Sequence, residues 1–468
     1  MNVSTIAALS TAQVQALTTD QFRALTTTQF AALSSVQLGA LTTAQMLSMN
    51  TAQVSAFKLG PTQLAALRAD QLSVLNTDQV QALSSAQIGG LSTTQVAGLT
   101  TTQFAAMTTS NLAGFTSSQI QALATDRLDA LSTAQFAALK SSQLIGIDPT
   151  KLAALDVEYL NNLGTAQLAA LLPSQLSALT TGVIQSLGTL QYASLRSNQL
   201  ASLRTDQIAA LETADLAVLN SAQLQSLTTA QVRALSTQQL QQMSTSQVAS
   251  LTSLQVASLK TDQLSGLETS DIAALSSTQV TALTTSQINR LSESQVKALE
   301  TQDLAVLSSL QLRALSIQQM TQLTDGQLTT LSSNQVGQLL PAQLNALTTA
   351  QVALLKPAQA SAFSTAQIAG LDDERVAVLS TAAWAVMNMG QVRALTTDQV
   401  AALTTAQVAG LSPLQLSYMT TAQIQAIEVD DLAVLTGTQL KSLSGAQFKA
   451  MTTAQVDQLS TSQIAAMS

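Results

Sequence analysis

The residues best suited to chemistry in this sequence are carboxylates that recur at a fixed spacing. An acid follows another by three residues in the segments LETADLAV (Glu212, Asp215), LETSDIAA (Glu268, Asp271), LETQDLAV (Glu300, Asp303) and IEVDDLAV (Glu428, Asp430, Asp431). Carboxylate oxygens are preferred ligands of calcium and other hard cations. We therefore take Glu428, Asp430 and Asp431 as the candidate metal ligands.

A structural interpretation of the same acids stays open. Carboxylates near the first turn of a helix stabilise the positive end of its dipole. Arg204 lies eight residues before Glu212, and Lys260 lies eight residues before Glu268, which favours charge pairing between neighbouring segments. The segments also lack a glycine-bearing loop with ligands at the regular spacing of known calcium loops.

The rest of the composition argues against catalysis. The 468 residues include no His and no Cys, which removes the usual general base, the commonest metal ligand and all thiolate chemistry. Ser and Thr are abundant, but a nucleophilic Ser needs a neighbouring base, and no phosphate-binding or dinucleotide motif occurs. We predict that the protein is not an enzyme and has no catalytic residues and no cofactor.

Charge and hydropathy restrict the partners. The net charge is −8, whereas a nucleic-acid partner requires a basic face. No apolar run approaches the roughly 18 residues that a membrane span needs. We therefore predict no nucleic-acid partner and no membrane span. The first residues, MNVSTIAALSTAQ, show no signal peptide, so the protein stays inside the cell, leaves by a route that ignores its N-terminus, or belongs to a longer protein.

The elements that position the acids are set by an eight-residue repeat, the octad, as in LSTAQVQA at residues 9–16. Its positions 1 to 8 read Leu, Ser/Thr, Ser/Thr, any residue, Gln, an apolar residue, any residue, and a small residue. Seven octads cover residues 1–56 and fifty run from Leu67 to Ala466, separated by the ten-residue unit FKLGPTQLAA at 57–66. Aligning LGPTQLAA to the octad makes Phe57 and Lys58 the extra residues, as an outward loop or a kink. We predict one continuous repeat domain over residues 1–468, with 58 units and this register break.

Neither a continuous helix nor a strand fits a period of eight. Eight residues at 100° each make an apolar stripe drift by about 80° per octad, and a strand would put large residues on both faces. The six prolines locate the break, because all fall at position 3: Pro61, Pro149, Pro173, Pro341, Pro357 and Pro413. Proline favours the first residue of a helix. Position 2 is then the N-cap, the Gln at position 5 completes a capping box, and positions 1 and 6 form a hydrophobic staple.

This frame predicts an all-α solenoid of very short capped helices. Each octad supplies one helix of about six residues, which is too short to be stable alone and must stack on its neighbours around a Leu/Val core. The small residue at position 8 allows close approach of the backbones. The number of helices per coil stays open at three or four. The alternative is a β-solenoid, since Thr-Thr pairs favour strands.

Three residues depart from the octad in ways that need an interpretation. Trp384 stands at position 6, which favours a role in filling the core, with a local binding patch as the alternative. Tyr159 and Val183 replace the Gln of position 5, and we expect them to be tolerated defects.

Two families resemble this sequence at the octad. The phrase LTTAQVRA, residues 227–234, resembles the opening helix of the DNA-binding repeats of TAL effectors, but the second helix, the base-reading loop and the positive charge are missing. The tandem octads of the whole chain resemble those of large bacterial proteins described as adhesin-like or heme-utilisation-like. This resemblance implies an extracellular or cell-surface protein. A heme site has no His or Cys ligand here.

Two functions follow as hypotheses. The first is a structural, non-enzymatic rod or filament subunit of the bacterial surface or matrix. Solenoids normally need polar terminal repeats, whereas MNVSTIAA and LSTSQIAAMS keep the apolar pattern, so we expect self-association end to end. The second is a binding surface in which a Ser/Thr/Gln ladder makes repeated weak contacts with glycans, ice or a cell surface.

Overall fold

A computed structural model describes residues 2–57 and 63–467 of the chain, and its secondary structure there is helical throughout. No residue of these two ranges lies in a strand. The prediction of an all-α fold is therefore confirmed, and the β-solenoid alternative is wrong. The residues group into two compact units, Met1–Leu235 and Ser236–Ser468.

The described ranges hold 58 helical elements, which is one for each unit of the repeat. Every α-helix begins at position 3 of its octad and has four to seven residues. In the first unit the elements are α1 (Val3–Ala7), α2 (Thr11–Gln15), α3 (Thr19–Arg23), α4 (Thr27–Phe30), α5 (Ser35–Gly39), α6 (Thr43–Ser48), α7 (Thr51–Ser55), the 3₁₀ helix η1 (Leu64–Ala66), α8 (Ala69–Ser73), α9 (Thr77–Gln81), α10 (Ser85–Gly89), α11 (Thr93–Ala97), α12 (Thr101–Ala106), α13 (Thr109–Leu112), α14 (Ser117–Gln121), α15 (Thr125–Asp129), α16 (Thr133–Ala137), α17 (Ser141–Leu144), α18 (Pro149–Ala154), α19 (Val157–Asn161), α20 (Thr165–Leu168), α21 (Pro173–Ala178), α22 (Thr181–Ser186), α23 (Thr189–Ser194), α24 (Ser197–Ser202), α25 (Thr205–Ala209), α26 (Thr213–Ala217), α27 (Ser221–Ser226) and α28 (Thr229–Ala234).

The second unit continues the same pattern without interruption of the octad. Its elements are α29 (Thr237–Gln241), α30 (Thr245–Ser250), α31 (Ser253–Ser258), α32 (Thr261–Ser265), α33 (Thr269–Ala273), α34 (Ser277–Ala282), α35 (Thr285–Arg290), α36 (Glu293–Ala298), α37 (Thr301–Val306), α38 (Ser309–Ala314), α39 (Ile317–Thr321), α40 (Asp325–Thr330), α41 (Ser333–Gly337), α42 (Pro341–Ala346), α43 (Thr349–Ala353), α44 (Pro357–Ala360), α45 (Thr365–Gly370), α46 (Asp373–Val378), α47 (Thr381–Ala385), α48 (Met389–Ala394), α49 (Thr397–Ala401), α50 (Thr405–Ala409), α51 (Pro413–Tyr418), α52 (Thr421–Ala426), α53 (Val429–Ala433), α54 (Gly437–Lys441), α55 (Gly445–Ala450), α56 (Thr453–Asp457) and α57 (Thr461–Met467).

The capping residues determine where each helix starts. In α2, Ser10 has extended backbone angles (φ −69°, ψ 160°), its hydroxyl accepts from the Gln13 N–H at 3.2 Å, and the Gln13 Oε1 accepts from the Ser10 N–H at 2.9 Å. This is the capping box predicted from the repeat. Five prolines stand at the first helical residue as predicted, namely Pro149, Pro173, Pro341, Pro357 and Pro413. Pro61 lies outside the described residues.

Positions 6 and 1 of the octads form the core of each unit. Val96 and Leu99, for example, are fully buried, and Trp384 is buried at position 6, which confirms its predicted role in filling the core. Position 8 comes close to an octad of the preceding coil, because a Cβ added to Gly114 would lie 2.2 Å from the carbonyl oxygen of Ser85. Small residues at position 8 therefore allow close packing of the coils, as expected.

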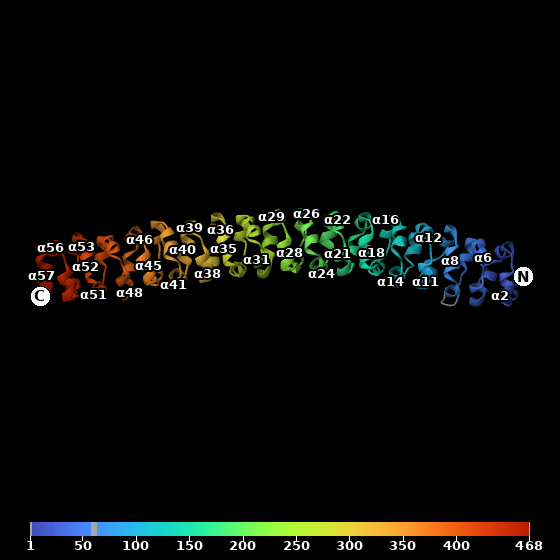
Figure 1. Cartoon of the computed structure of the whole chain (residues 1–468), viewed down its shortest axis with the longest axis horizontal. Helices are drawn as coiled ribbons and strands as arrows, with labels where there is room; N and C mark the ends of the chain where they lie inside the picture. The colour runs from blue at the N-terminus through green and yellow to red at the C-terminus, as the bar shows by residue number, and fades with distance from the viewer. Residues whose placement is uncertain (1, 58–62, 468) are drawn as a thin grey trace. The chain divides into compact units, whose positions relative to one another are not determined.

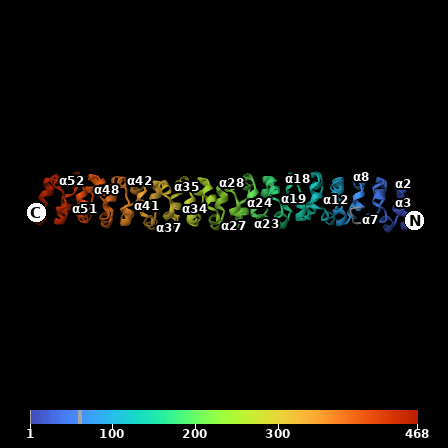
Figure 2. The same ribbon diagram turned by 90° about the horizontal axis from the view of Figure 1, so that it is seen from below.

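Successive helices wind into coils within each unit, and they follow one another in chain order (Figure 1). Helices three apart pack together, such as α18 with α21 in the first unit and α31 with α34 in the second. The same succession of short helices is seen from below (Figure 2). Hydrogen bonds join side chains to carbonyls 28 residues earlier, as from Gln103 to Leu75 at 2.8 Å. Since 28 residues are three and a half octads, each coil holds between three and four helices.

The register break leaves the stacking of the coils intact, and Phe57 is not part of an outward loop. Phe57 is buried, its ring lies 5.1 Å from that of Phe30, and its carbonyl accepts from Gln87 at 3.0 Å. These are the properties of the Leu at position 1 elsewhere, so the predicted assignment of Phe57 to the insertion is wrong. The hydrogen bond from Gln87 to Phe57 spans 30 residues instead of 28. The two extra residues therefore fall between Phe57 and Gln63 in the sequence, and Lys58 lies outside the described residues.

Candidate functional site: the glutamine ladder and its acidic gaps

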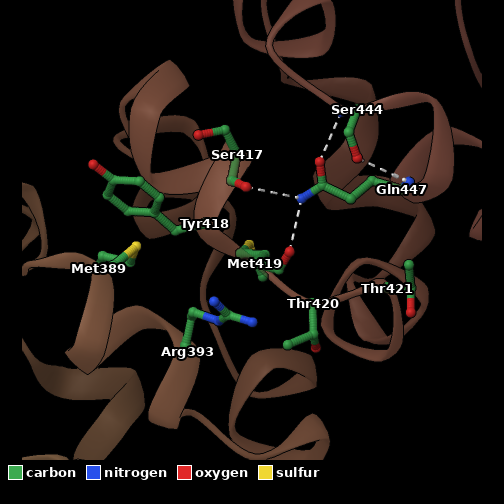
Figure 3. Close-up of a pocket in the computed structure, with 9 residues that line it drawn as sticks. All are labelled: Met389, Arg393, Ser417, Tyr418, Met419, Thr420, Thr421, Ser444 and Gln447. Atoms are coloured by element: carbon green, nitrogen blue, oxygen red, sulfur yellow. Dashed lines mark hydrogen bonds between the residues drawn. The ribbon is translucent and has the colours of Figure 1, made fainter.

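The position-5 glutamines form a ladder of hydrogen bonds between coils, which we call the glutamine ladder. Figure 3 shows one rung, in which the Gln447 Oε1 accepts from the Ser444 N–H at 2.7 Å and the Gln447 Nε2 donates to the Met419 carbonyl at 2.8 Å. The same Nε2 also donates to Leu416 at 2.9 Å. Gln447 therefore caps its own helix with its oxygen and caps the carbonyl end of a helix one coil earlier with its nitrogen. This second role explains why the octad carries Gln rather than Glu, since both suit a capping box but only Gln donates.

Five replacements at position 5 keep the donor. Asn, Arg, Lys and Tyr all donate to the carbonyl 28 residues earlier, in the pairs Asn111–Leu83, Arg127–Leu99 (3.2 Å), Lys151–Leu123 (2.7 Å), Tyr159–Leu131 (2.9 Å) and Arg375–Leu347 (3.1 Å). Tyr159 is therefore a functional rung and not a tolerated defect. Val183 and Ala383 have apolar side chains, so they donate no hydrogen bond from position 5. The ladder thus accepts hydrogen-bond donors of varied shape.

Four position-5 residues are aspartates, which cannot donate when they are ionised. Asp215, Asp271, Asp303 and Asp431 are all buried. Two of them accept a hydrogen bond from a hydroxyl of the preceding coil. The Thr245 Oγ1 donates to Asp271 at 2.9 Å, and the Ser277 Oγ donates to Asp303 at 2.8 Å. Burial raises the pKa of Asp303, and the Ser277 hydroxyl opposes that shift. These two aspartates therefore keep a bond between coils, with the direction of donation reversed.

Asp215 has no such partner for one of its oxygens. It is 4% exposed, and its Oδ2 is buried without a hydrogen bond. Burial raises the pKa of Asp215 to about 6. Asp215 follows Ile184 by 31 residues, the spacing at which Gln amides donate elsewhere, and the Tyr192 hydroxyl donates to the Ile184 carbonyl instead. Tyr192 is fully buried, which raises the pKa of its hydroxyl above the ordinary value, so it stays protonated and acts as a donor.

The predicted ligands Glu428, Asp430 and Asp431 lie together at the start of α53. They line one open pocket of about 430 Å³ with residues of the preceding coil, namely Ala401, Leu403, Thr404 and Thr405. Asp431 is buried, whereas Glu428 and Asp430 are exposed. Within residues 2–57 and 63–467, no group of three or more acidic, His or Cys side chains is arranged to hold a metal ion. The candidate residues are thus neighbours in a pocket without forming a three-carboxylate cluster.

The predicted charge pairing between octads does not occur at the acidic segments. Arg204 pairs at 3.0 Å with Asp206 of its own octad, and not with Glu212. Among the described residues, the ion pairs do not include one between Lys260 and Glu268. A residue two positions further on is closer than one in the next octad, because the chain turns into a new helix between octads.

A second open pocket, of about 440 Å³, lies over α48, α51, α52 and α55 (Figure 3). Met389, Arg393 and Tyr418 line it together with the polar side chains of the rung at Gln447. Tyr418 is the one aromatic residue at position 8 of the octads, where the other residues are mostly small. The pocket therefore combines an aromatic ring, a cation and several hydroxyls on an otherwise uniform surface.

The octads match the ALTTAQ repeat family over residues 1–27, 80–109, 208–245, 229–261, 264–301, 296–333, 384–413, 424–461 and 437–468. These ranges cover more than half of the sequence, so the chain belongs to the ALTTAQ repeat family. The adhesin-like and heme-utilisation-like resemblance is not part of this match. None of the curated proteins matches the chain.

One solved structure similar to the chain is titled "Structure of APUM23-GGAAUUGACGG". The similarity has 11% sequence identity and a TM-score of 0.17, over 97% of this chain and 96% of the other. Over the described part of this chain, no helix has the length and apolarity to cross a membrane.

Proposed function

We propose that the protein is a structural, non-enzymatic repeat protein whose end faces join head to tail in a filament. The observation that carries this proposal is the complementarity of the two end faces. Inside each unit, glutamine amides of one coil donate to carbonyls of the coil before it, and apolar position-6 residues are covered by the coil that follows. The faces at residues 2–30 and 440–467 carry the two halves of this interface.

The N-terminal face supplies donors. Gln13 and Gln21 are exposed, and their Oε1 atoms accept from the N-caps Ser10 and Thr18. Neither Nε2 has a hydrogen-bond partner among the described residues, whereas the buried Gln45 amide donates to Val14 at 2.8 Å. These two amides are therefore ladder rungs that are available to donate to another coil.

The C-terminal face supplies acceptors and apolar surface. Phe448, Val456 and Ile464 stand at position 6 and are 38%, 39% and 51% exposed, while this position is buried in the interior of the units. No glutamine amide in the described ranges donates to the carbonyls of Phe448 or Met451. A head-to-tail contact between copies would pair these carbonyls with glutamine amides and bury the apolar side chains. Such a heterologous contact does not close on itself and gives filaments.

Sedimentation velocity and electron microscopy of the 468-residue chain at rising concentration test this proposal. We expect filaments that shorten when Val456→Asp and Ile464→Asp are introduced together. The matched control is Leu190→Asp with Leu254→Asp, two apolar residues that are 77% and 75% exposed on the sides of the coils. A monomer at all concentrations, or equal effects of both pairs, would contradict the proposal.

An extracellular or cell-surface location belongs to the same proposal. The resemblance of the octads to those of secreted bacterial proteins supports this location. A repetitive filament also suits a structural role outside the cell. Labelling of intact cells with a membrane-impermeant reagent, against a cytoplasmic marker, tests it. A protein that is labelled only after lysis is not at the surface.

A binding surface is the second candidate, and one observation favours it. Met389, Arg393 and Tyr418 form the pocket of Figure 3 on an otherwise repetitive Ser/Thr/Gln face. An aromatic ring beside hydroxyls and a cation suits a sugar ring, with apolar contact on one side and hydrogen bonds on the other. A glycan array with the intact chain and with Tyr418→Ala tests this function. Binding that is absent, or that the variant retains, would speak against this pocket.

A further inference from the structure

We propose that the pocket of Met389, Arg393 and Tyr418 binds an acidic sugar, whose ring carries a single negative charge such as a carboxylate. This inference rests on the second candidate function, the binding surface, and names the class of glycan that the surface takes. The pocket lies within the second unit and has a volume of about 440 Å³, which is in the range of small-molecule sites. The residues that line it include one cation and no Asp or Glu.

A second set of hydrogen bonds between coils shows what is exceptional about Arg393. Side chains at position 7 donate to the position-8 carbonyl 25 residues later, in the pairs Gln15–Ala40 (2.7 Å), Gln81–Ala106 (2.8 Å), Gln241–Gly266 (2.8 Å), Asn289–Ala314 (2.9 Å) and Asn345–Gly370 (2.7 Å). Two arginines at position 7 do the same. The Nε of Arg23 donates to Ser48 at 3.1 Å, and the Nε of Arg313 donates to Gln338 at 2.8 Å. The following coil therefore holds the guanidinium of these two arginines.

Arg393 has the same octad position without that bond. The residue 25 positions later is Tyr418, the one aromatic residue at position 8. Among the described residues, Arg393 has neither a hydrogen bond to the Tyr418 carbonyl nor an ion pair. Its side chain is exposed and lines the pocket, and Figure 3 shows it grouped with Met389 and Tyr418 around Met419. A guanidinium with five N–H donors is thus available to a ligand.

The charge of the pocket favours a ligand with one negative charge. A carboxylate accepts two parallel N–H bonds from one guanidinium, which fixes its orientation as well as its position. A phosphate monoester carries a charge of about −1.5 to −2 at pH 7, which one cation does not balance, and the lining adds no Lys to Arg393. The chain as a whole has a net charge of −8. The affinity for an anion must therefore come from direct contact with Arg393.

The other lining residues suit the ring and the hydroxyls of a sugar. Tyr418 is half-buried, and Met389 is 49% exposed at position 3, where Ser or Thr is usual. The Thr420 hydroxyl accepts from the Gln423 N–H at 3.2 Å and has no acceptor of its own among the described residues, so its hydrogen is available for donation. The Ser444 hydroxyl accepts in the same way at the start of α55. One wall of the pocket is apolar, and another donates hydrogen bonds.

Saturation-transfer NMR of the full chain at pH 7.5, with sodium glucuronate and glucose as the probes, tests the proposal. We expect a Kd of about 1 mM for glucuronate, the affinity that an ordinary ligand efficiency gives for a molecule of this size. Glucose has the same ring without the charge, and we expect it to bind at least about fivefold more weakly, because the hydrogen bonds to the charged group are missing. Glucose 6-phosphate should bind no more tightly than glucuronate.

Three variants assign the charge and the ring contact separately. Arg393→Gln introduces a residue that stands at position 7 in other octads, so the coil stays folded. It should weaken the binding of glucuronate to the level of glucose and leave the binding of glucose unchanged. The matched control is Arg313→Gln, at the same octad position with its guanidinium held by Gln338, which should change neither affinity. Tyr418→Ser restores a small residue at position 8 and should weaken the binding of both sugars.

The possible failures separate this inference from the function on which it rests. Equal affinities for glucuronate and glucose, or a preference that Arg393→Gln retains, would overturn the acidic sugar, while binding that depends on Tyr418 would still support the binding surface. Tighter binding of glucose 6-phosphate than of glucuronate would overturn the single charge. Absence of binding of either sugar up to about 20 mM, well above the expected Kd, would overturn both the inference and the second candidate function.

Discussion

The segments around residues 57–66 and 183–215 depart from the octad in opposite ways. In the first, the sequence gains two residues, yet Gln63, Gln71, Gln79 and Gln87 all reach their carbonyls, over 30 residues instead of 28. In the second, the register is unbroken, but Val183 and Asp215 supply no amide donor and one buried oxygen has no partner. The solenoid thus absorbs a change in chain length more easily than the loss of a donor between coils.

The reason lies in where the two changes fall. A connection between helices is short and can lengthen at a cost that grows slowly with its length. A carbonyl at the buried end of a helix has no water to bond, so losing its donor costs the full penalty of an unsatisfied group. Because each α-helix has only four to seven residues, a large share of its carbonyls lies at such an end.

The largest effect is expected at Phe57, which decides whether the first segment is a loop or part of the core. Phe57→Ala removes a buried ring that contacts Phe30, and we expect a loss of about 4 kcal/mol in the free energy of unfolding of this segment. Hydrogen exchange of the amides of α4 and α7 measures it. A loss below about 1 kcal/mol, as for an exposed position, would mean that Phe57 belongs to the insertion and not to the core.

A change of one atom in a rung tests the importance of the donor itself. Gln103 accepts from the Thr100 N–H at 2.8 Å and donates to Leu72 and Leu75 at 2.9 and 2.8 Å. Gln103→Glu keeps the capping box and removes only the donor, so we expect a loss of about 3 kcal/mol at pH 7.5. Urea denaturation followed by helical circular dichroism measures it.

The control for that substitution is Gln13→Glu. Gln13 is exposed and bonds only to its own N-cap, so we expect a change below about 0.5 kcal/mol. Equal losses of stability in Gln103→Glu and Gln13→Glu would mean that position 5 stabilises the protein through the capping box and not through the bond between coils.

The sequence alone predicted the fold almost fully, because the octad repeats the same local signals many times. Ser or Thr at position 2, Pro at position 3 and Gln at position 5 fix the start of a helix through bonds within four residues. Phe57 is the exception, because the segment LGPTQLAA fits the octad in sequence, while the core accepts Phe in place of Leu at position 1. The number of helices per coil depends on contacts 25 to 33 residues apart, which local signals do not contain.

The second role of position 5 was missed, although the sequence held a clue to it. A capping box accepts Glu as well as Gln, yet no octad has Glu at position 5, and Asn, Arg, Lys and Tyr replace Gln in five octads. Their common property is a donor. The acids Glu428, Asp430 and Asp431 are candidate metal ligands on the sequence, but the described residues hold no group of three acids arranged for a metal ion. The contribution of Leu403 and Thr405 to their pocket depends on the coil geometry.

The unpaired oxygen of Asp215 makes the stability of the second segment depend on pH. Its pKa is raised to about 6, above the ordinary value of about 3.9 in an unfolded chain, so the folded state binds the proton more tightly. The stabilisation is complete below about pH 4 and is lost as the pH rises through about 6, by about 2 to 3 kcal/mol. Chemical denaturation between pH 4 and pH 8 measures it.

Asp215→Asn is the control for this dependence. It cannot titrate, and its amide can donate, so the step near pH 6 should disappear and the stability at pH 8 should rise. A step that persists in Asp215→Asn belongs to another group, of which Asp303 is the first candidate, because burial also raises its pKa.

The smallest effect is expected at Tyr192, whose hydroxyl donates to Ile184 where a Gln at position 215 would donate. Tyr192→Phe keeps the buried ring and leaves that carbonyl unpaired, at a cost of about 1.5 kcal/mol. The double substitution with Asp215→Gln supplies an amide at the ladder position, so we expect the cost of Tyr192→Phe to fall below about 0.5 kcal/mol in that background. The difference between the two costs is a coupling energy, and unfolding by urea measures all four proteins. A coupling energy near zero would mean that Tyr192 only fills the core. Full coupling would mean that the Tyr192 hydroxyl supplies the hydrogen bond that Asp215 does not donate.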